Sequence, residues 1–354
     1  MGGATTSLLR AAPALEELGW RFVFWAPRPS SLFAELEERG LDAHGAPEPF
    51  IGYSLAALGV APGASRRLAR APSYFGAFSA LLRRVQPELV HVNSLHLMTE
   101  AAVARLHRRP VVLHVHEMVA ANRKGRMARR LAHRLSDVAV GVSDSAALAL
   151  STSRHRALTV YEAAPEGPRL RREPGPQTVV GTVGVISPRK GTDLFAEAAK
   201  LVAAETRDIA FRVAGAADSP LDEAWAQARI ETLERLGIHH APRVVMEQEL
   251  AALDIFALPA RSDPFPLVVL EAMVAGLPVV GTRVDGIAEQ LTPTTGVLVE
   301  PESPRALAEA ILDLHSRPGL RAELGDAARA RALEEFPIER QVAGLDAAYR
   351  QALR

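Results

Sequence analysis

The sequence contains no cysteine, has no net charge and shows no apolar run long enough to cross a bilayer. Without cysteine, a disulfide framework and a thiolate metal site are both excluded. The 41 basic and 41 acidic residues balance to a formal net charge of zero, which argues against a dedicated nucleic-acid-binding protein. No signal-peptide pattern is found either. Together these absences lead us to expect a cytoplasmic protein that does not bind nucleic acid.

Alternating strand-like and helical segments predict an α/β fold with parallel sheets. The length of 354 residues suggests two domains, and 48% hydrophobic residues can fill two cores. The expected strands are 21–26, 89–93, 111–116, 137–142 and 158–161, then 179–186, 209–214, 243–246, 255–258, 278–282 and 296–299. A stretch rich in Pro, Gly and Arg at 165–177 has no apolar period and is interpreted as the linker. It places the first boundary at 165/166, and a final helix is expected from about 338.

A pair of acidic residues marks one candidate binding helix. Asp263, followed by Pro264, suits a helix N-cap because its carboxylate can accept hydrogen bonds from the free amides of the first turn. Glu271 lies roughly 10–12 Å further along the axis at ~1.5 Å per residue. A sugar diphosphate could bridge them, with its sugar near Asp263, its ribose near Glu271 and its diphosphate facing the helix N-terminus. Alone, such a pair is more often an ordinary structural ion pair.

A strand, a loop and a helix at 178–195 form a second candidate site. The loop carries Arg189, Lys190 and Gly191, and the helix is expected to begin near Gly191. Glycine lets the backbone approach a phosphate, and the two cations neutralise its charge. A solvated basic turn would show the same residues, but the acidic helix some 80 residues later favours a phosphate site.

These two segments together resemble the nucleotide-sugar site of the retaining GT-B glycosyltransferases of family 4. That family has two acidic residues eight apart on such a helix, and a Lys-Gly loop that supplies a lysine to the donor diphosphate. The resemblance covers nearly the whole chain, with three departures at the site. Asp263 stands where the family usually has Glu, Pro266 where Gly is common, and Val185 where an Arg is frequent.

The resemblance implies a GT-B fold, with two Rossmann-like doubly wound domains facing each other across a cleft. Residues 1–165 would bind the acceptor, residues 166–336 would bind the donor, and a helix at 337–354 would cross back to the first domain. Lys190, helped by Arg189, would neutralise the leaving diphosphate, and Glu271 would bind the ribose. The implied donor-binding residues are Gly2, Gly3, Gly184, Arg189, Lys190, Asp263, Phe265, Pro266, Leu267 and Glu271.

The expected strand at 111–116 ends in polar residues, and the carboxyl ends of parallel strands are where such folds bind ligands. The family often has a histidine at this strand end, facing the donor sugar, and His116 followed by Glu117 matches it best. Strand alternation puts His114 on the same face. The resemblance therefore implies His116, Lys190 and Asp263 as the catalytic residues. No metal is expected, because the nearby histidines (His91, His114, His116) lack carboxylate partners and GT-B enzymes do not generally need one.

The resemblance fails at the N-terminus. The family opens with a strand, then a Gly-Gly loop, then a helix whose start faces the donor phosphate. Here Gly2-Gly3 directly follow Met1, the next helix is expected at 5–18, and the next strand at 21–26. The first strand of the N-terminal domain is therefore expected to be missing, which would leave neighbouring strand edges unpaired.

Two further segments have open interpretations. The basic segment Arg123–Arg134 has Met127, Leu131 and Leu135 spaced at four, and could contact an anionic membrane as a peripheral element. A solvated helix with its apolar stripe facing the core is the commoner explanation. The second segment, at 246–249, is interpreted as a shortened loop that would alter recognition of the donor base.

The sequence thus predicts a retaining glycosyltransferase that moves a sugar from a nucleoside-diphosphate sugar to a hydroxyl of a glycan, a lipid or a small molecule. The alternative is a non-catalytic protein of the same fold that binds nucleotide sugars or glycans. The missing strand, Val185 and the short loop favour that alternative. A sugar-nucleotide epimerase fits less well, because the Lys-Gly loop and the acidic helix match family 4 better.

Overall fold

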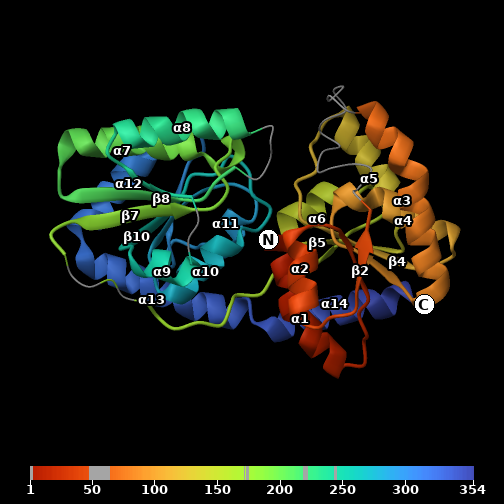
Figure 1. Ribbon diagram of the computed structural model, residues 1–354. Coiled ribbons are helices and arrows are strands. Elements are labelled where there is room, and N and C mark those ends of the chain that lie inside the picture. The colour runs from red at the N-terminus through yellow and green to blue at the C-terminus, as the bar shows by residue number, and fades with distance from the viewer. Residues whose placement is uncertain (1–2, 48–63, 171, 173–174, 218–221, 243–244) are drawn as a thin grey trace. The chain divides into compact units, whose positions relative to one another are not determined.

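The computed structural model describes residues 3–47, 64–170, 172, 175–217, 222–242 and 245–354. It confirms the α/β class, because parallel strands alternate with helices along the chain (Figure 1). The chain divides into two compact units. Unit 1 is Met1–Tyr161 with Ile338–Arg354, and unit 2 is Glu162–Pro337.

Unit 2 contains one six-stranded parallel sheet in the order β12-β11-β10-β7-β8-β9. Its strands are β7 (Thr178–Val183), β8 (Ile209–Ala214), β9 (His239–Ala241), β10 (Ile255–Leu258), β11 (Val279–Thr282) and β12 (Val297–Val299). The strand order reverses between β7 and β10, since β8 follows on one side of β7 and β10 lies on the other. Open α/β sheets bind ligands at the carboxyl ends of the strands at such a switch point. Both predicted donor-binding loops follow these two strands.

Helices cover both faces of this sheet. One core cluster contains residues of the helices α7 (Thr192–Glu205), α8 (Glu223–Arg235) and α12 (Pro304–Ser316). Figure 1 shows α9 (Met246–Ala251), α10 (Leu267–Ala275) and α13 (Pro318–Glu335) on the side opposite α7 and α8. A short helix, α11 (Ile287–Gln290), follows β11. Seven of the nine residues of α10 are buried, which explains its apolar sequence and makes its one ionisable residue, Glu271, conspicuous.

Unit 1 contains two parallel sheets among the described residues. The first pairs β1 (Phe24–Pro27) with β2 (Ala43–Ala46), and the second has the order β3-β4-β5-β6. The strands of the second are β3 (Val90–Val92), β4 (Val111–Val115), β5 (Val138–Gly141) and β6 (Leu158–Thr159). All five residues of β4 are buried, as expected of a parallel strand covered on both faces.

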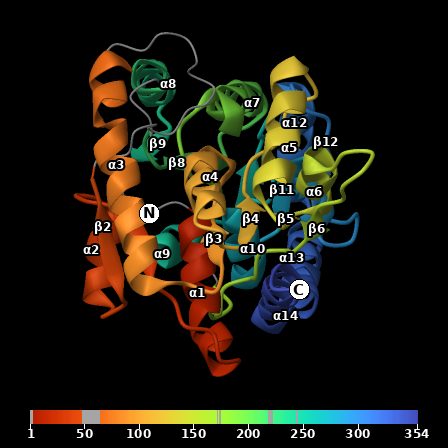
Figure 2. The ribbon, with the colours of Figure 1, turned by 90° about the vertical axis from the view of Figure 1, so that its right-hand side faces the viewer.

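The helices of unit 1 pack on both faces of the larger sheet. Helices α1 (Gly3–Glu17) and α14 (Ile338–Ala352) share one core cluster with β4 and β5. Helices α4 (Met98–Leu106) and α5 (Arg123–Leu135) contribute to the cluster on the other face. Figure 2 shows α3 (Ala64–Val85), α4 and α5 as neighbouring helices of one layer. The remaining helical segments are α2 (Ser31–Glu38), η2 (Leu95–Leu97) and α6 (Asp144–Leu150).

Most of the expected strands are present within a few residues, and the exceptions are two edge strands. The strand β2, Ala43–Ala46, was not predicted. The prediction of a strand at 243–246 was wrong, because Met246 begins α9 and the edge strand of the sheet is β9. Residues 243 and 244 lie outside the described residues. Both missed strands consist of Ala, His and Gly, so they lack the apolar alternation from which a strand is predicted.

Candidate functional site

The loop after β7 is shaped by two glycines that other residues could not replace. Gly184 has φ +143° and Gly191 has φ +73°, both in the region that L side chains rarely adopt. A Cβ added to Gly191 would lie 1.9 Å from the carbonyl oxygen of Pro259, so the loop also passes very close to the end of β10. Between them, residues Pro188–Lys190 form one 3₁₀ turn, η3, and α7 begins at Thr192 as predicted.

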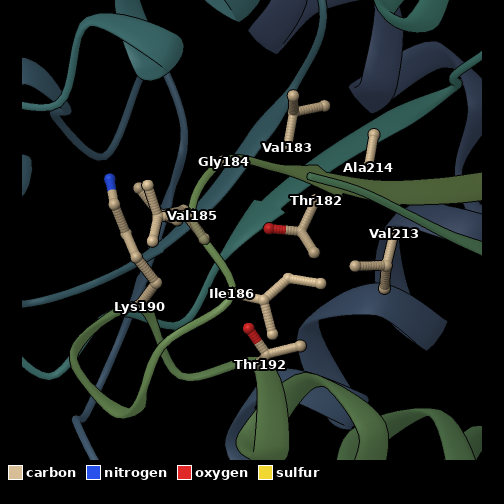
Figure 3. A pocket seen from close by; sticks show the side chains of 10 residues that line it. Thr182, Val183, Gly184, Val185, Ile186, Lys190, Thr192, Val213 and Ala214 are labelled. Atoms are coloured by element: carbon tan, nitrogen blue, oxygen red, sulfur yellow. The ribbon is translucent and has the colours of Figure 1, made fainter. Parts of the chain in front are cut away.

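Lys190 is tied to Asp263, which follows β10. Its Nζ donates a hydrogen bond of 2.6 Å to Asp263 Oδ2, and Arg189 Nη1 donates to the same oxygen at 3.1 Å. The side chain of Lys190 is 13% exposed and that of Asp263 is 7% exposed. Figure 3 shows Lys190 and Val185 on one side of the loop, and Ile186 and Thr192 on the other. The structure therefore brings together four of the predicted donor-binding residues: Gly184, Arg189, Lys190 and Asp263.

The charge of Asp263 is maintained despite its burial. Burial raises the pKa of this carboxyl, but the charges of Lys190 and Arg189 and their hydrogen bonds outweigh that effect. The pKa of Asp263 is therefore held below its ordinary value, and the group is an anion paired with two cations. The ammonium group of Lys190 has three N–H donors, and the bond to Asp263 uses one of them.

The prediction that Asp263 caps the acidic helix is wrong. Helix α10 begins at Leu267, Pro266 occupies its N-cap position, and no side chain caps it. The reason lies in the two prolines, because a residue that precedes proline is disfavoured from helical geometry. The chain therefore stays extended through Pro266, which has φ −69° and ψ 115°. The carboxylate of Asp263 is left to pair with the β7 loop, and the buried ring of Phe265 packs edge-on against Phe336 at 5.3 Å.

Asp285 holds the segment that carries Asp263, a role that no motif in the sequence predicts. Its Oδ2 accepts hydrogen bonds from the Ser262 hydroxyl at 2.5 Å and from the Asp263 amide at 3.0 Å. Asp285 has φ +39°, a conformation that few non-glycine residues adopt. This unusual backbone directs its carboxylate at the start of the 262–266 loop.

In unit 1, His116 lies directly after β4 and is held by Asn93. His116 Nε2 lies 2.8 Å from Asn93 Oδ1, while Asn93 Nδ2 donates at 3.1 Å to the carbonyl of Ala4 in the first turn of α1. Gly3 begins α1, so the structure brings the start of this helix and His116 to the same asparagine. Gly2 lies outside the described residues. Asn93 was not predicted, because its role depends on three segments far apart in the sequence.

Two other histidines belong to the core rather than to the edge of unit 1. His114 is fully buried, and burial, followed by the nearby His116 and His91, holds its pKa well below the ordinary value. Burial likewise lowers the pKa of His91 to about 4, and its Nδ1 lies 2.6 Å from the hydroxyl of Tyr349. Both ring nitrogens of His114 lack a hydrogen-bond partner. Within the described part of the chain, no group of three or more His, Cys, Asp or Glu residues is arranged to hold a metal ion.

The segment at 246–249 is the start of a helix and not a shortened loop. Helix α9 begins at Met246, and its Glu249 is buried and forms a bidentate ion pair with Arg212 of β8 at 2.8 and 2.9 Å. The prediction of a short loop near the donor base was therefore wrong. Residues Met-Glu-Gln-Glu-Leu-Ala are all good helix formers, which was the available signal.

The fold is that of known GT-B glycosyltransferases. The chain is similar to Anabaena HepE in complex with UDP and glucose, with a TM-score of 0.80, 19% identity and coverage of 99% of this chain and 96% of that one. It is also similar to sucrose-phosphate synthase from Thermosynechococcus elongatus, with a TM-score of 0.69, 18% identity and coverage of 93% and 95%.

Sequence comparisons identify the family. Residues 1–161 match the family model described as Glycosyltransferase Family 4, and residues 177–317 match that of Glycosyl transferases group 1. The chain belongs to glycosyltransferase family 4.

Curated relatives match part of the chain. A D-inositol 3-phosphate glycosyltransferase from Segniliparus rotundus is 34% identical over 190 residues, which are 50% of this chain and 41% of that protein. A GDP-mannose-dependent mannosyltransferase from Corynebacterium glutamicum, which acts on a monoacylated phosphatidylinositol monomannoside, is 32% identical over 169 residues, 43% of this chain and 42% of that protein. The matched segments thus span less than half the length of these relatives.

Proposed function

We propose that this protein is a retaining glycosyltransferase that transfers a sugar from a nucleoside-diphosphate sugar to a hydroxyl of a glycan, lipid or small-molecule acceptor. The observation that carries the proposal is the meeting of Lys190 and Asp263, from the loops after β7 and β10, at the switch point of the unit 2 sheet. Unit 2 binds the donor, and unit 1 binds the acceptor.

In the proposed reaction, the bond between the sugar C1 and the phosphate oxygen breaks, and a bond from C1 to the acceptor oxygen forms on the same face. The leaving diphosphate takes up the proton of the acceptor hydroxyl. Negative charge develops on that diphosphate, and Lys190, helped by Arg189, stabilises it in place of a metal ion. Asp263 and the amides of Phe265 and Leu267 bind the sugar or the phosphates, and Glu271 binds the ribose. For His116, Gly2 and Gly3, the proposed roles in donor binding rest on the family resemblance alone.

Release of nucleoside diphosphate tests this proposal. Related proteins are named for GDP-mannose or were solved with UDP and glucose, so UDP-glucose and GDP-mannose are the first donors to use. Incubation with a panel of glycan, lipid and sugar acceptors should release UDP or GDP at a rate that EDTA leaves unchanged. The product should keep the anomeric configuration of the donor by NMR. Tight binding of donor without release over the whole panel would instead favour the non-catalytic binding protein.

Glu271→Ala should weaken binding of the nucleoside diphosphate about tenfold, because a carboxylate that accepts from two ribose hydroxyls would be lost. Isothermal titration calorimetry with UDP or GDP measures this. Glu309→Ala is the matched control, since Glu309 lies on α12 of the same unit with its side chain 71% exposed. Equal affinity in the wild type and Glu271→Ala would contradict the assignment of Glu271.

We also infer a peripheral contact of α5 with an anionic membrane surface. The expectation that its apolar stripe faces the core is wrong at Met127 and Leu131, whose side chains are 70% and 40% exposed. Buried Gly125 and Ala132 face the core instead, and a Cβ on Gly125 would lie 1.8 Å from the Ala120 carbonyl oxygen. The helix has no acidic residue, and its exposed cations are Arg123, Lys124, Arg126, Arg130 and Arg134.

Cations beside exposed apolar side chains on one helix fit an anionic lipid surface. Nucleic acid fits less well, because α5 has no Phe, Tyr or Trp on which a base could stack. None of the described helices is long and apolar enough to cross a bilayer, so the inferred contact is with the surface alone.

The wild type should therefore sediment with vesicles of phosphatidylglycerol and not with vesicles of phosphatidylcholine. Arg130→Gln/Arg134→Gln should weaken this binding by more than about tenfold, at ~1 kcal/mol per cation near the surface. Arg283→Gln/Arg305→Gln in unit 2 is the matched control and should bind as the wild type does. Equal sedimentation with both lipids, or preferential binding of RNA over vesicles, would contradict the inference.

A further inference from the structure

The side chain of Arg261, in the loop after β10, joins the lysine loop to two neighbouring elements of unit 2. Its Nη1 donates to the carbonyl of Pro188 at 2.7 Å, at the first residue of the 3₁₀ turn that ends in Lys190. Its own backbone N–H donates to the carbonyl of Arg189 at 2.8 Å. Position 261 therefore holds two successive carbonyl groups of the turn, Pro188 with the arginine side chain and Arg189 with the backbone amide, which any residue other than proline would keep there.

The same guanidinium is itself held on two sides. Nη1 and Nη2 donate to the two oxygens of Asp193, in the first turn of α7, both at 2.8 Å. Nε and Nη2 donate to Glu302, in the segment between β12 and α12, at 2.6 and 3.1 Å. The planar fork of arginine can bind two carboxylates and a carbonyl at once, which the single ammonium of lysine cannot reproduce.

The contact between Arg261 and the turn occurs where the two loops already press together. Gly191, directly after Lys190, has no room for a Cβ against the Pro259 carbonyl. Arg189 Nη1 also donates to the Ser262 carbonyl at 3.0 Å. Every residue from Pro259 to Asp263 except Ala260 thus has a described contact with the turn or with Gly191. Arg261 anchors this contact to α7 and to the segment after β12.

Arg261 also changes the charge that a phosphate would meet. Asp193 lies in the first turn of α7, and an unpaired carboxylate there would repel an anionic donor at the end of the helix that otherwise favours anions. The bidentate pair with Arg261 neutralises Asp193 without removing it from the helix. Arg261 therefore acts twice, on the position of Lys190 and on the sign of the local charge.

We propose that Arg261 is a positioning residue that holds the Lys190 turn in the geometry needed to bind the donor diphosphate. This inference rests on the proposed function, since it takes Lys190 as the ligand of the diphosphate. The proposed role differs from that of a residue that only stabilises unit 2. A positioning role predicts a loss specific to the diphosphate group, whereas a structural role predicts equal losses for all nucleotides.

The test compares nucleoside diphosphate with nucleoside monophosphate, using UDP and UMP or GDP and GMP, whichever pair the wild type binds. Arg261→Ala should weaken diphosphate binding at least about tenfold, because misplacing a binding group by ~1 Å has large effects. Monophosphate binding should change less than about twofold. Arg261→Lys should recover little of the diphosphate affinity. Arg283→Ala is the matched control, since its pair with Glu300 is exposed and separate from the turn.

Hydrogen exchange gives a second readout that needs no ligand. Amides of residues 186–191 should exchange faster in Arg261→Ala than in the wild type, while those of β8 should not change. Unchanged exchange and unchanged diphosphate affinity in a folded Arg261→Ala protein would overturn the inference, as would equal losses for both nucleotides. A wild type that does not prefer diphosphate would instead refute the proposed site, and the inference with it.

Discussion

Lys190→Ala should reduce the rate of sugar transfer by about 10²–10³-fold, the range typical of removing one electrostatic stabiliser of developing charge. The lysine is the one cation of the loop whose side chain is largely buried, and one of its three donors is bound to Asp263. The remaining donors can bind the leaving diphosphate. The measurement is release of nucleoside diphosphate at saturating donor, so that a change in donor affinity does not obscure the rate.

Lys190 also contributes to the stability of the fold, because it is paired with a buried carboxylate. Removing Lys190 leaves the buried carboxylate of Asp263 with Arg189 as its cationic partner, which should cost about 1–3 kcal/mol of unfolding free energy. Lys190→Ala/Asp263→Asn removes the buried charge as well. The double variant should regain most of the lost stability and none of the lost activity.

This pair of variants separates catalysis from folding. If the double variant recovered activity together with its melting temperature, Lys190 would have acted through stability alone. Full turnover by Lys190→Ala at saturating donor would likewise remove Lys190 from the mechanism.

Acidification should destabilise unit 1 strongly, because the buried His114 and the partly buried His91 are both held as neutral groups. The pKa of His91 is lowered to about 4, chiefly by burial and then by His116, and that of His114 lies well below its ordinary value. In the unfolded chain both titrate near ~6.5. Between about pH 6.5 and 4 the unfolded state therefore binds more protons, and the stability of the folded state falls as the pH falls. Above the pKa of the unfolded chain, near ~6.5, both histidines are neutral in either state and the folded state keeps its full stability.

The expected loss for His91 alone is about 3 kcal/mol at pH 4, from a shift of roughly 2.5 pH units at ~1.36 kcal/mol each, and His114 adds to it. Urea unfolding of the full chain between pH 7 and 4 measures this loss of stability. Protection of the β4 amides from hydrogen exchange at the same pH values is a second measurement. His114→Phe should show a smaller pH dependence than the wild type. The exposed His239, replaced by Phe, should leave the dependence unchanged. A wild type whose β4 amides are equally protected at both pH values would contradict the prediction.

A sequence reveals those parts of a site where a local requirement, such as a backbone conformation or a charge, restricts the position to one or two residue types. Gly191 was recognisable because a positive φ demands glycine, and Lys190 was singled out because a cation beside such a glycine suits a phosphate. Arg261 was not, since its partner Asp193 lies 68 residues away and the pairing depends on how β7 and β10 are placed side by side. Asp263 does lie against Lys190, but its expected role as a helix cap was wrong, because Pro264 and Pro266 postpone the helix.

The fold, too, was predicted where local sequence determines it and missed where distant contacts do. Buried parallel strands such as β4 and β10 are apolar throughout, apart from His114 in β4, and were predicted almost residue by residue. The edge strands β2 and β9 are short, partly exposed and poor in branched residues, so their sequences do not distinguish them from loops. These segments form strands because they pair with β1 and β8, which lie far from them in the sequence or do not determine the pairing by pattern alone.

We propose that the switch point of unit 2 binds a diphosphate. Calorimetric titration of the wild-type protein with a nucleoside diphosphate, the matching monophosphate and the free nucleoside measures this directly. UDP with UMP and uridine, and GDP with GMP and guanosine, are the two series to compare. In one series, the affinity of the protein should rise at least about tenfold from monophosphate to diphosphate, since the second phosphate reaches Lys190. Equal affinity for the diphosphate and the monophosphate in both series would contradict it.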